Sequence, residues 1–253
     1  MLILADIGNT NIVFAIYEGD EQLFNWRVYS DVKKTGDEYY IIIKSLLDSS
    51  NIEYQKIDKA IISSVVPNLT MSVEKIFHRL SITDITIVSH DMKTGLIRSS
   101  IPGELGSDIL CNLAYAHYLH PDKDVMVIDF GTALTFSTVD KTGYVKGVSI
   151  LPGIITSVNA LFGSTAQLPQ VDLKHPNTIL GRNSIDSIRS GIMYGYKGIV
   201  ETIIKQTEVE LNTKLFVILT GGLSVTISPL INNIDSLDKN HTLNGLRLLS
   251  NLN

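Results

Sequence analysis

The sequence predicts an α/β protein with two similar lobes, each a mixed β-sheet flanked by helices. Two observations predict it. The segments LILADIGNTNIVFAIYEGDEQLFNW and VMVIDFGTALTFSTVDKTGYVKGV share one plan of strand, Asp-x-Gly turn, strand, turn and strand. Their aspartates, Asp6 and Asp129, lie about half the chain apart. A long repeat of this kind indicates gene duplication, and we expect an N-terminal lobe at 1–120 and a C-terminal lobe at 121–253.

In the first half, short apolar runs between turn residues predict strands, and longer runs with helix-starting residues predict helices. The expected strands are Leu2–Asp6, Ile12–Tyr17, Gln22–Tyr29, Lys59–Val66 and Ile85–Ser89. Helices are expected at Asp37–Leu47, which has acidic residues in its first turn, and at Asn68–Leu80.

The second half shows the same succession. Strands are expected at Val125–Asp129, Leu134–Val139, Tyr144–Ile150 and Leu215–Leu219, and helices at about Gly153–Phe162 and Ser184–Gln206. We expect the long segment that begins at Ser184 to carry the chain between the two lobes.

Composition excludes several classes of function. Hydrophobic residues make up 44% and charged residues 19% of the 253 residues, which is typical of a soluble globular protein. The net charge of -5 and the lack of a basic run argue against nucleic acid as a partner. No apolar stretch reaches the roughly 18 residues of a membrane helix, so no membrane partner is expected. The single cysteine, Cys111, suits a reducing cytoplasm and is expected to be buried.

The two Asp-x-Gly turns have the composition of phosphate-binding loops. Gly8 and Gly131 would let backbone N–H groups approach phosphate oxygens, and small side chains such as Asn9 and Thr132 would add donors. An aspartate at the end of the preceding strand is a ligand for Mg²⁺. One such turn is common in proteins, but a matched pair could hold a nucleotide from both sides in a cleft between the lobes.

A third glycine turn, Thr220-Gly221-Gly222, follows a buried strand and fits a backbone platform for adenosine. The chain has no GxxxxGK[ST] sequence, so a P-loop enzyme is excluded on motif grounds. These features together predict an ATP-dependent kinase for a small molecule.

The chain resembles the type III pantothenate kinase family from its first residue almost to its last. The matching segments, in the family's order, are Asp6-Ile-Gly-Asn-Thr10, Thr35-Gly-Asp-Glu-Tyr39, Ser63-Ser-Val-Val-Pro67, Pro102-Gly-Glu-Leu-Gly-Ser-Asp108, Asp129-Phe-Gly-Thr-Ala133, Leu151-Pro-Gly153, Leu168-Pro169, Gly181-Arg-Asn-Ser184, Ser190-Gly191 and Thr220-Gly-Gly222. The resemblance implies duplicated actin-like (ribonuclease H-like) lobes in a cytoplasmic homodimer. It also implies phosphorylation of pantothenate by ATP, the first step of coenzyme A biosynthesis, with Mg²⁺ and an activating K⁺ or NH₄⁺.

The resemblance also assigns residues to roles. ATP contacts fall on Asp6, Ile7, Gly8, Asn9, Thr10, Asn11, Ile12, Val13, Gly131, Thr132, Gly221 and Gly222. Asp129 falls on the ligand of the monovalent cation, and Asp6 is a candidate ligand for Mg²⁺. Asp108 falls on the proton acceptor, and substrate contacts fall on Ser99, Gly106, Ser107, Asp108, Ile109 and Ser184.

Two of these polar features also have a structural interpretation. An acidic residue such as Asp108 is favourable in the first turn of a helix, whatever its chemistry. Ser63 and Ser64 end a buried strand without a G-x-S-x-G sequence, so we expect them to make structural hydrogen bonds.

The chain departs from the family pattern around the acyl substrate. The family's Gly-Ala-Asp-Arg reads Gly106-Ser107-Asp108-Ile109, so isoleucine replaces an arginine. A pocket tyrosine is replaced by Ser99, and a threonine from the partner subunit by Ser184. Three explanations remain open. Arg98 or Arg182 replaces the lost guanidinium, or the substrate is another small alcohol. Alternatively, the chain is a weakly active paralogue that acts as an ATP-binding regulatory protein.

Overall fold

The computed structural model describes residues 1–98, 105–163 and 171–253. Within these ranges the chain forms two compact units, which we describe one at a time. The first comprises Met1–Thr94, Pro102–Tyr115 and Thr242–Asn253, and the second comprises Gly95–Ile101 and Ala116–His241. Ser99 and the Leu168-Pro169 segment lie outside the described residues.

The first unit is built on a five-stranded mixed sheet. Its strands are β1 (Leu2–Ile7), β2 (Asn11–Glu18), β3 (Glu21–Tyr29), β4 (Lys59–Ser64) and β5 (Asp84–Ile87), in the order β3-β2-β1-β4-β5. The first three strands pair antiparallel, whereas β4 pairs parallel with β1 and β5 pairs parallel with β4. All five predicted strands of this half are therefore present.

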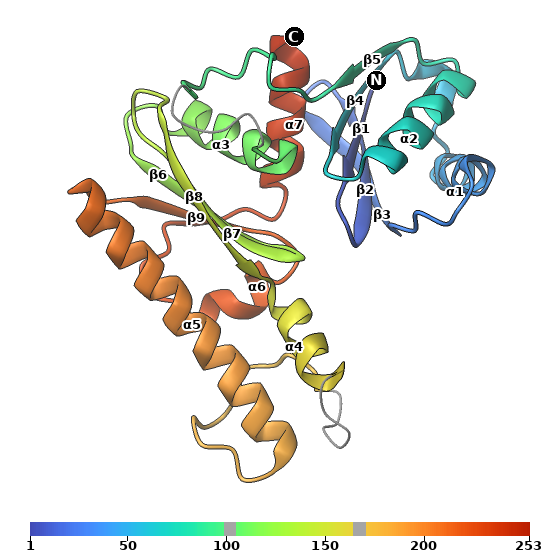
Figure 1. The fold of residues 1–253 in the computed structure, drawn as a ribbon. Coiled ribbons are helices and arrows are strands. Elements are labelled where there is room, and N and C mark those ends of the chain that lie inside the picture. The colour runs from blue at the N-terminus through green and yellow to red at the C-terminus, as the bar shows by residue number, and fades with distance from the viewer. Residues whose placement is uncertain (99–104, 164–170) are drawn as a thin grey trace. The chain divides into compact units, whose positions relative to one another are not determined.

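Two helices pack side by side against this sheet (Figure 1). Helix α1 (Gly36–Ser49) begins at a capping box, in which Thr35 Oγ1 accepts from the Glu38 amide at 3.3 Å and Glu38 accepts from the Thr35 amide at 2.7 Å. Helix α2 (Pro67–Arg79) begins at Pro67, because proline is favourable in a first helical turn. The strand before it therefore ends at Ser64, two residues earlier than predicted. A short 3-10 turn (Tyr54–Lys56) joins α1 to β4.

Helix α7 (His241–Leu252) completes the first unit and was not predicted. Its sequence, HTLNGLRLLSNL, contains two asparagines and a glycine, which are weak helix formers. Tertiary packing supplies the missing stability. Gly245 lies against the backbone of Cys111 in α3 (Ser107–Leu119), where a Cβ atom would overlap the Cys111 carbonyl oxygen and lie 2.7 Å from its carbonyl carbon. Cys111 itself is fully buried, as predicted.

The second unit repeats the sheet of the first. Its strands are β6 (Val125–Phe130), β7 (Ala133–Val139), β8 (Val145–Pro152), β9 (Phe216–Thr220) and β10 (Ser236–Leu237), in the order β8-β7-β6-β9-β10. The antiparallel and parallel pairings match those of the first sheet strand for strand. This shared topology confirms that the two halves are duplicates of one plan.

Helices α4 (Ile154–Gly163) and α5 (Ser184–Leu211) pack against each other beside the second sheet, and α6 (Ser224–Ile227) and a 3-10 turn (Ser228–Leu230) follow β9 (Figure 1). All of α5 belongs to the second unit, because Met193, Tyr196, Val200 and Ile204 bury one helix face in the core of that unit. The prediction that this segment carries the chain between lobes is therefore wrong. The chain returns to the first unit only at Thr242. Across the described ranges, no helix has both the length and the apolar composition that a membrane crossing requires.

The close approach of α7 to α3 makes a specific prediction for Gly245. Alanine is the better helix former, but Gly245→Ala places a methyl group on the backbone of Cys111. We expect a loss of roughly 1–3 kcal/mol in the free energy of unfolding, measured by urea denaturation. Gly198→Ala in α5 is the matched control, since nothing lies within 4 Å of its added Cβ. An equal or higher stability for Gly245→Ala would contradict the tight packing.

Candidate active site

The first Asp-x-Gly turn joins β1 to β2 through residues 8–11. Asp6 lies near the end of β1, and the Gly8 amide donates to the Asn11 carbonyl at 2.9 Å. Ser30, the residue after β3, fastens this turn: its hydroxyl donates to the Gly8 carbonyl at 2.6 Å and its amide to the Thr10 carbonyl at 2.9 Å. Asn9 and Thr10 are exposed. Ser30 thus holds the turn through two of its carbonyl groups.

The second Asp-x-Gly turn is built in the same way through residues 131–133, one residue fewer. The Gly131 amide donates to the Ala133 carbonyl at 3.1 Å. Gly153, the residue after β8, donates its amide to the Thr132 carbonyl at 2.9 Å, and Thr156 Oγ1 donates to the same carbonyl at 2.7 Å. Thr132 is exposed. In both units the residue that follows the third strand therefore holds the turn that follows the first.

The two aspartates also have equivalent neighbours in their sheets. Asp6 is in register with Ser63 of β4, and Asp129 is in register with Thr220 of β9. The Ser63 hydroxyl donates to Asp6 Oδ1 at 3.0 Å. The Thr220 hydroxyl is buried and has no hydrogen-bond partner among the residues that the structure describes. The duplicated site thus keeps a hydroxyl beside each carboxylate but uses the two hydroxyls differently.

The third glycine turn packs directly against Asp129. Gly221 has φ +90°, a conformation that glycine adopts without strain. A Cβ atom at Gly221 would overlap Asp129 Oδ1 and lie 2.6 Å from the Phe130 nitrogen. Only glycine fits this position, so the turn predicted as a nucleotide platform lies beside the second Asp-x-Gly turn. Gly222 is exposed.

Asp108 is the second residue of α3, in the first unit. Its Oδ1 accepts from the Ile109 amide at 2.9 Å, so the carboxyl group occupies the N-terminal turn of the helix, as the structural interpretation predicted. A Cβ atom at Gly106 would lie 2.5 Å from the same oxygen, so a larger residue there would displace the carboxyl group. Burial raises the pKa of Asp108 above its ordinary value, and the hydrogen bond from Ile109 only partly opposes this. The carboxyl group is therefore a stronger base than an exposed aspartate.

The substrate-side residues of the resemblance have different surroundings. Ile109 is 5% exposed and belongs to the buried residues. Ser184 is exposed at the first position of α5, after the N-cap Asn183, whose side chain accepts from the Asp186 amide at 2.9 Å. Arg98 is partly buried and Arg182 is exposed, both in the second unit.

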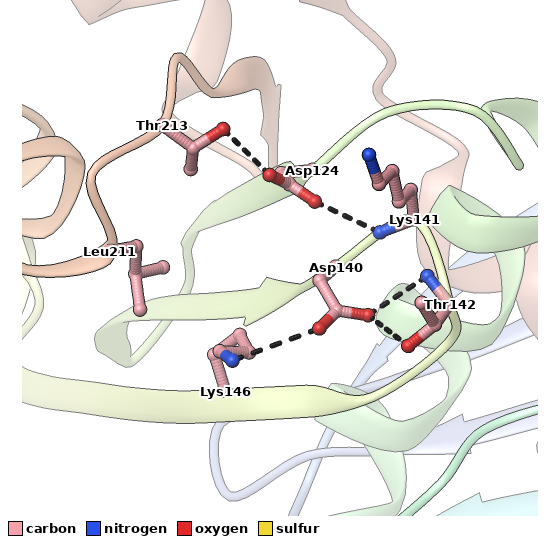
Figure 2. Close-up of a pocket in the computed structure, with 7 residues that line it drawn as sticks. All are labelled: Asp124, Asp140, Lys141, Thr142, Lys146, Leu211 and Thr213. Atoms are coloured by element: carbon pink, nitrogen blue, oxygen red, sulfur yellow. Dashed lines mark hydrogen bonds and ion pairs between the residues drawn. The ribbon is translucent and has the colours of Figure 1, made fainter.

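A hollow of about 230 Å³ in the second unit lies outside these predicted sites (Figure 2). Its carboxylates are used by the fold. Asp124 accepts from the Lys141 amide at 2.9 Å and from Thr213 Oγ1 at 2.7 Å, and Asp140 accepts from the Thr142 amide at 2.9 Å and hydroxyl at 2.6 Å. The bonds of Asp140 hold the turn between β7 and β8, and Asp124 ties this turn to Thr213 after α5, so we assign the hollow a structural role. Among the described residues, no three His, Cys, Asp or Glu side chains gather in a group that could hold a metal ion.

The repeated sheet and its matched loops define the class of the protein: it has the duplicated actin-like fold. Among solved structures with this fold, the activator of the 2-hydroxyisocaproyl-CoA dehydratase from Clostridium difficile, solved with bound ADPNP, aligns with a TM-score of 0.58. The alignment covers 99% of this chain and 92% of that one at 14% identity, so it shows the fold alone.

The sequence places the chain more narrowly. The profile of the type III pantothenate kinase family matches residues 2–206. The type III pantothenate kinase of Brevibacillus brevis is 41% identical over 250 residues, with 98% of both chains covered. That of Geotalea daltonii is 40% identical, with 98% of this chain and 97% of the relative covered. The chain belongs to the type III pantothenate kinase family.

The burial of Ile109 makes a prediction about the arginine that it replaces. Ile109→Arg would introduce a charge at a position that is 5% exposed. We expect the free energy of unfolding to fall by about 2–4 kcal/mol, because a buried charge without a partner is costly. Ile109→Leu is the control and should cost less than about 1.5 kcal/mol. An Ile109→Arg variant that keeps the parent's thermal midpoint would contradict this prediction and show that an arginine side chain at position 109 escapes burial.

Proposed function

We propose that the protein transfers the γ-phosphoryl group of ATP to pantothenate and forms 4′-phosphopantothenate, the first step of coenzyme A biosynthesis. Family membership across the length of the chain carries the proposal. The two Asp-x-Gly loops, held by equivalent hydrogen bonds in the two units, support it, because phosphoryl transfer depends mainly on positioning and charge neutralisation.

The glycine turns serve ATP in this proposal. Asn9 and Thr10 in the first turn, and Gly131 and Thr132 in the second, are exposed and available to phosphate oxygens. Backbone amides in such turns approach an anion closely when glycine removes the side chain. Gly221 and Gly222 serve the adenosine part of the nucleotide. The remaining ATP contacts, Asp6, Ile7, Asn11, Ile12 and Val13, belong to the first turn and its strands.

Two cations belong to the proposal, and the available donors fit them. Asp6 would hold Mg²⁺ and Asp129 a monovalent cation, K⁺ or NH₄⁺. Both are carboxylates at strand ends, and oxygen ligands suit hard cations. Asp129 Oδ1 lies beside Gly221, and the buried hydroxyl of Thr220, its register neighbour, has no hydrogen-bond partner among the described residues. When bound, Mg²⁺ would neutralise phosphate charge; the chain itself positions the carboxylates and turns.

Asp108 orients the attacking hydroxyl of pantothenate and receives its proton. A loose transition state asks for little proton transfer early in the reaction, so a carboxylate suffices as the base. The raised pKa of Asp108 favours this role. Gly106, Ser107 and Ile109 around it, with Ser99 and Ser184, form the proposed substrate contacts, and Arg98 or Arg182 would bind the carboxylate of pantothenate.

We also propose a homodimer in the cytoplasm. Ser184 would reach the active site of the partner subunit. Ile179, Leu180 and Ile185, which flank it in sequence, are 61%, 79% and 42% exposed, an apolar surface that a partner subunit would cover. The free thiol of Cys111 and the use of ATP suit the cytoplasm.

The test is a coupled ADP-release assay with pantothenate in matched KCl and NaCl buffers. We expect turnover that is faster in KCl. Turnover with another small alcohol but not with pantothenate would leave a kinase with a different acceptor. ATP binding without turnover on any acceptor would leave a nucleotide-dependent regulatory protein. Either result would refute pantothenate phosphorylation.

Asp108→Asn separates chemistry from stability. The variant should lose about 100-fold or more of kcat, because asparagine cannot take a proton. Its thermal midpoint at pH 7 should equal or exceed that of the parent. The folded-state pKa of Asp108 is raised, so its favourable contribution to stability is present below the unfolded-state pKa and is lost as pH rises through the folded one. Above its folded-state pKa the parent carries the cost of a buried charge, and the variant does not. A variant with full turnover would exclude Asp108 as the base.

A further inference from the structure

A chain of hydroxyl groups in the first unit connects the start of α3 with the phosphate-side carboxylate. The Ser64 amide donates to Ser107 Oγ at 2.9 Å, Ser107 Oγ and Ser63 Oγ lie 3.0 Å apart, and Ser63 Oγ donates to Asp6 Oδ1 at 3.0 Å. Three elements meet in this chain: the ends of β1 and β4 and the first turn of α3.

The direction of the hydrogen bonds follows from the number of protons available. An ionised carboxylate only accepts hydrogen bonds, so the Ser63 hydroxyl donates its one proton to Asp6. The bond between the two serines must then be donated by Ser107. The Ser107 oxygen in turn accepts from the Ser64 amide. All donors point towards Asp6, an arrangement in which each bond polarises the next.

The serines of this hydrogen-bond chain are wholly or partly shielded from solvent. Ser63 is 0% exposed, and Ser64 and Ser107 are partly buried. A hydroxyl or amide shielded from water is destabilised when it loses its hydrogen-bond partner, so the three groups hold one another in place. Asp108 directly follows Ser107. The group that fixes Ser107 therefore also fixes the carboxyl group next to it.

We propose that Ser107 is a positioning residue, whose hydroxyl sets the separation between Asp108 and Asp6 by tying the first turn of α3 to the ends of β4 and β1. The inference rests on the proposed function, in which Asp6 serves the cation and phosphates and Asp108 serves the acceptor hydroxyl. In this role Ser107 acts through its bonds to Ser63 and Ser64, apart from the substrate contact proposed for it above. A displacement of about 1 Å between reacting groups can cost on the order of 100-fold in rate.

The kinetic test compares Ser107→Ala, Ser107→Thr, Ser63→Ala and the double variant Ser63→Ala/Ser107→Ala. We expect Ser107→Ala to lower kcat by roughly 5- to 50-fold while KM for ATP stays within about twofold, since the ATP turn keeps its own bonds to Ser30. Ser107→Thr keeps the hydroxyl and should recover most of kcat. The double variant should lose little more than Ser63→Ala, because both residues belong to one chain.

Ser72→Ala is the matched control, because its hydroxyl donates only within α2, to the Asn68 carbonyl at 3.2 Å. It should leave kcat at the parent value. A kcat for Ser107→Ala within twofold of the parent would overturn the inference. So would equal losses for the alanine and threonine variants, or losses that multiply in the double variant.

A second measurement does not depend on the acceptor. The carboxyl titration of Asp108, followed by ¹³C NMR in parent and Ser107→Ala, should show its pKa fall towards the ordinary value, because a loosened helix start admits water. The Ser64 amide should exchange with solvent faster. An unchanged titration and unchanged exchange would overturn the positioning role even in a protein that does not phosphorylate pantothenate. A parent without turnover, in contrast, refutes the proposed function and leaves this measurement to decide on Ser107.

Discussion

The pairing of the central strand in each sheet, β1 or β6, determines which residues surround the two Asp-x-Gly aspartates. β1 and β6 pair antiparallel with the next strand along the chain on one side and parallel with a later strand on the other. The antiparallel partner requires a tight turn directly after the strand, and the parallel partner ends at the same edge of the sheet. An aspartate near the end of the central strand therefore lies between a glycine turn and a hydroxyl residue. This constraint produces the pairs Asp6 with Ser63 and Asp129 with Thr220.

The sequence was most informative where local patterns decide the structure. Short apolar runs such as Leu2–Asp6 indicate buried strands. The repeated Asp-x-Gly plan correctly predicted that the two sheets share one topology. The sequence does not predict helix α7, because the helix is stabilised by packing against Cys111, and no local sequence pattern shows this contact. The end of β4 was misplaced by two residues because Pro67 starts a helix as readily as it stops a strand.

For the site, the sequence named the residues but not their partners. Ser63 and Ser64 were expected to make structural hydrogen bonds, and they do. Their bond to Ser107 joins residues 44 and 43 positions apart, and only the folded chain brings these together. Asp108 shows the two interpretations of the sequence combined, since the helix start that makes it locally favourable also buries it and raises its pKa. The division into lobes at 1–120 and 121–253 is a proposal about the duplication. The compact units are interleaved, because α7 belongs to the first of them.

The duplicated loops differ in ways that suit different tasks. The first turn is one residue longer, and its aspartate is tied through Ser63 to the helix that bears Asp108. The second aspartate lies instead against a glycine turn that leaves room for nothing larger than hydrogen, beside a buried hydroxyl without a described partner. In the proposed function, the carboxylate tied to the helix that bears Asp108 would serve the Mg²⁺ that accompanies the reacting phosphates. The carboxylate beside the Gly221 turn would serve the monovalent cation, for which oxygen ligands are suitable. The same fold thus gives each copy of the motif its own hydrogen-bonding and packing surroundings.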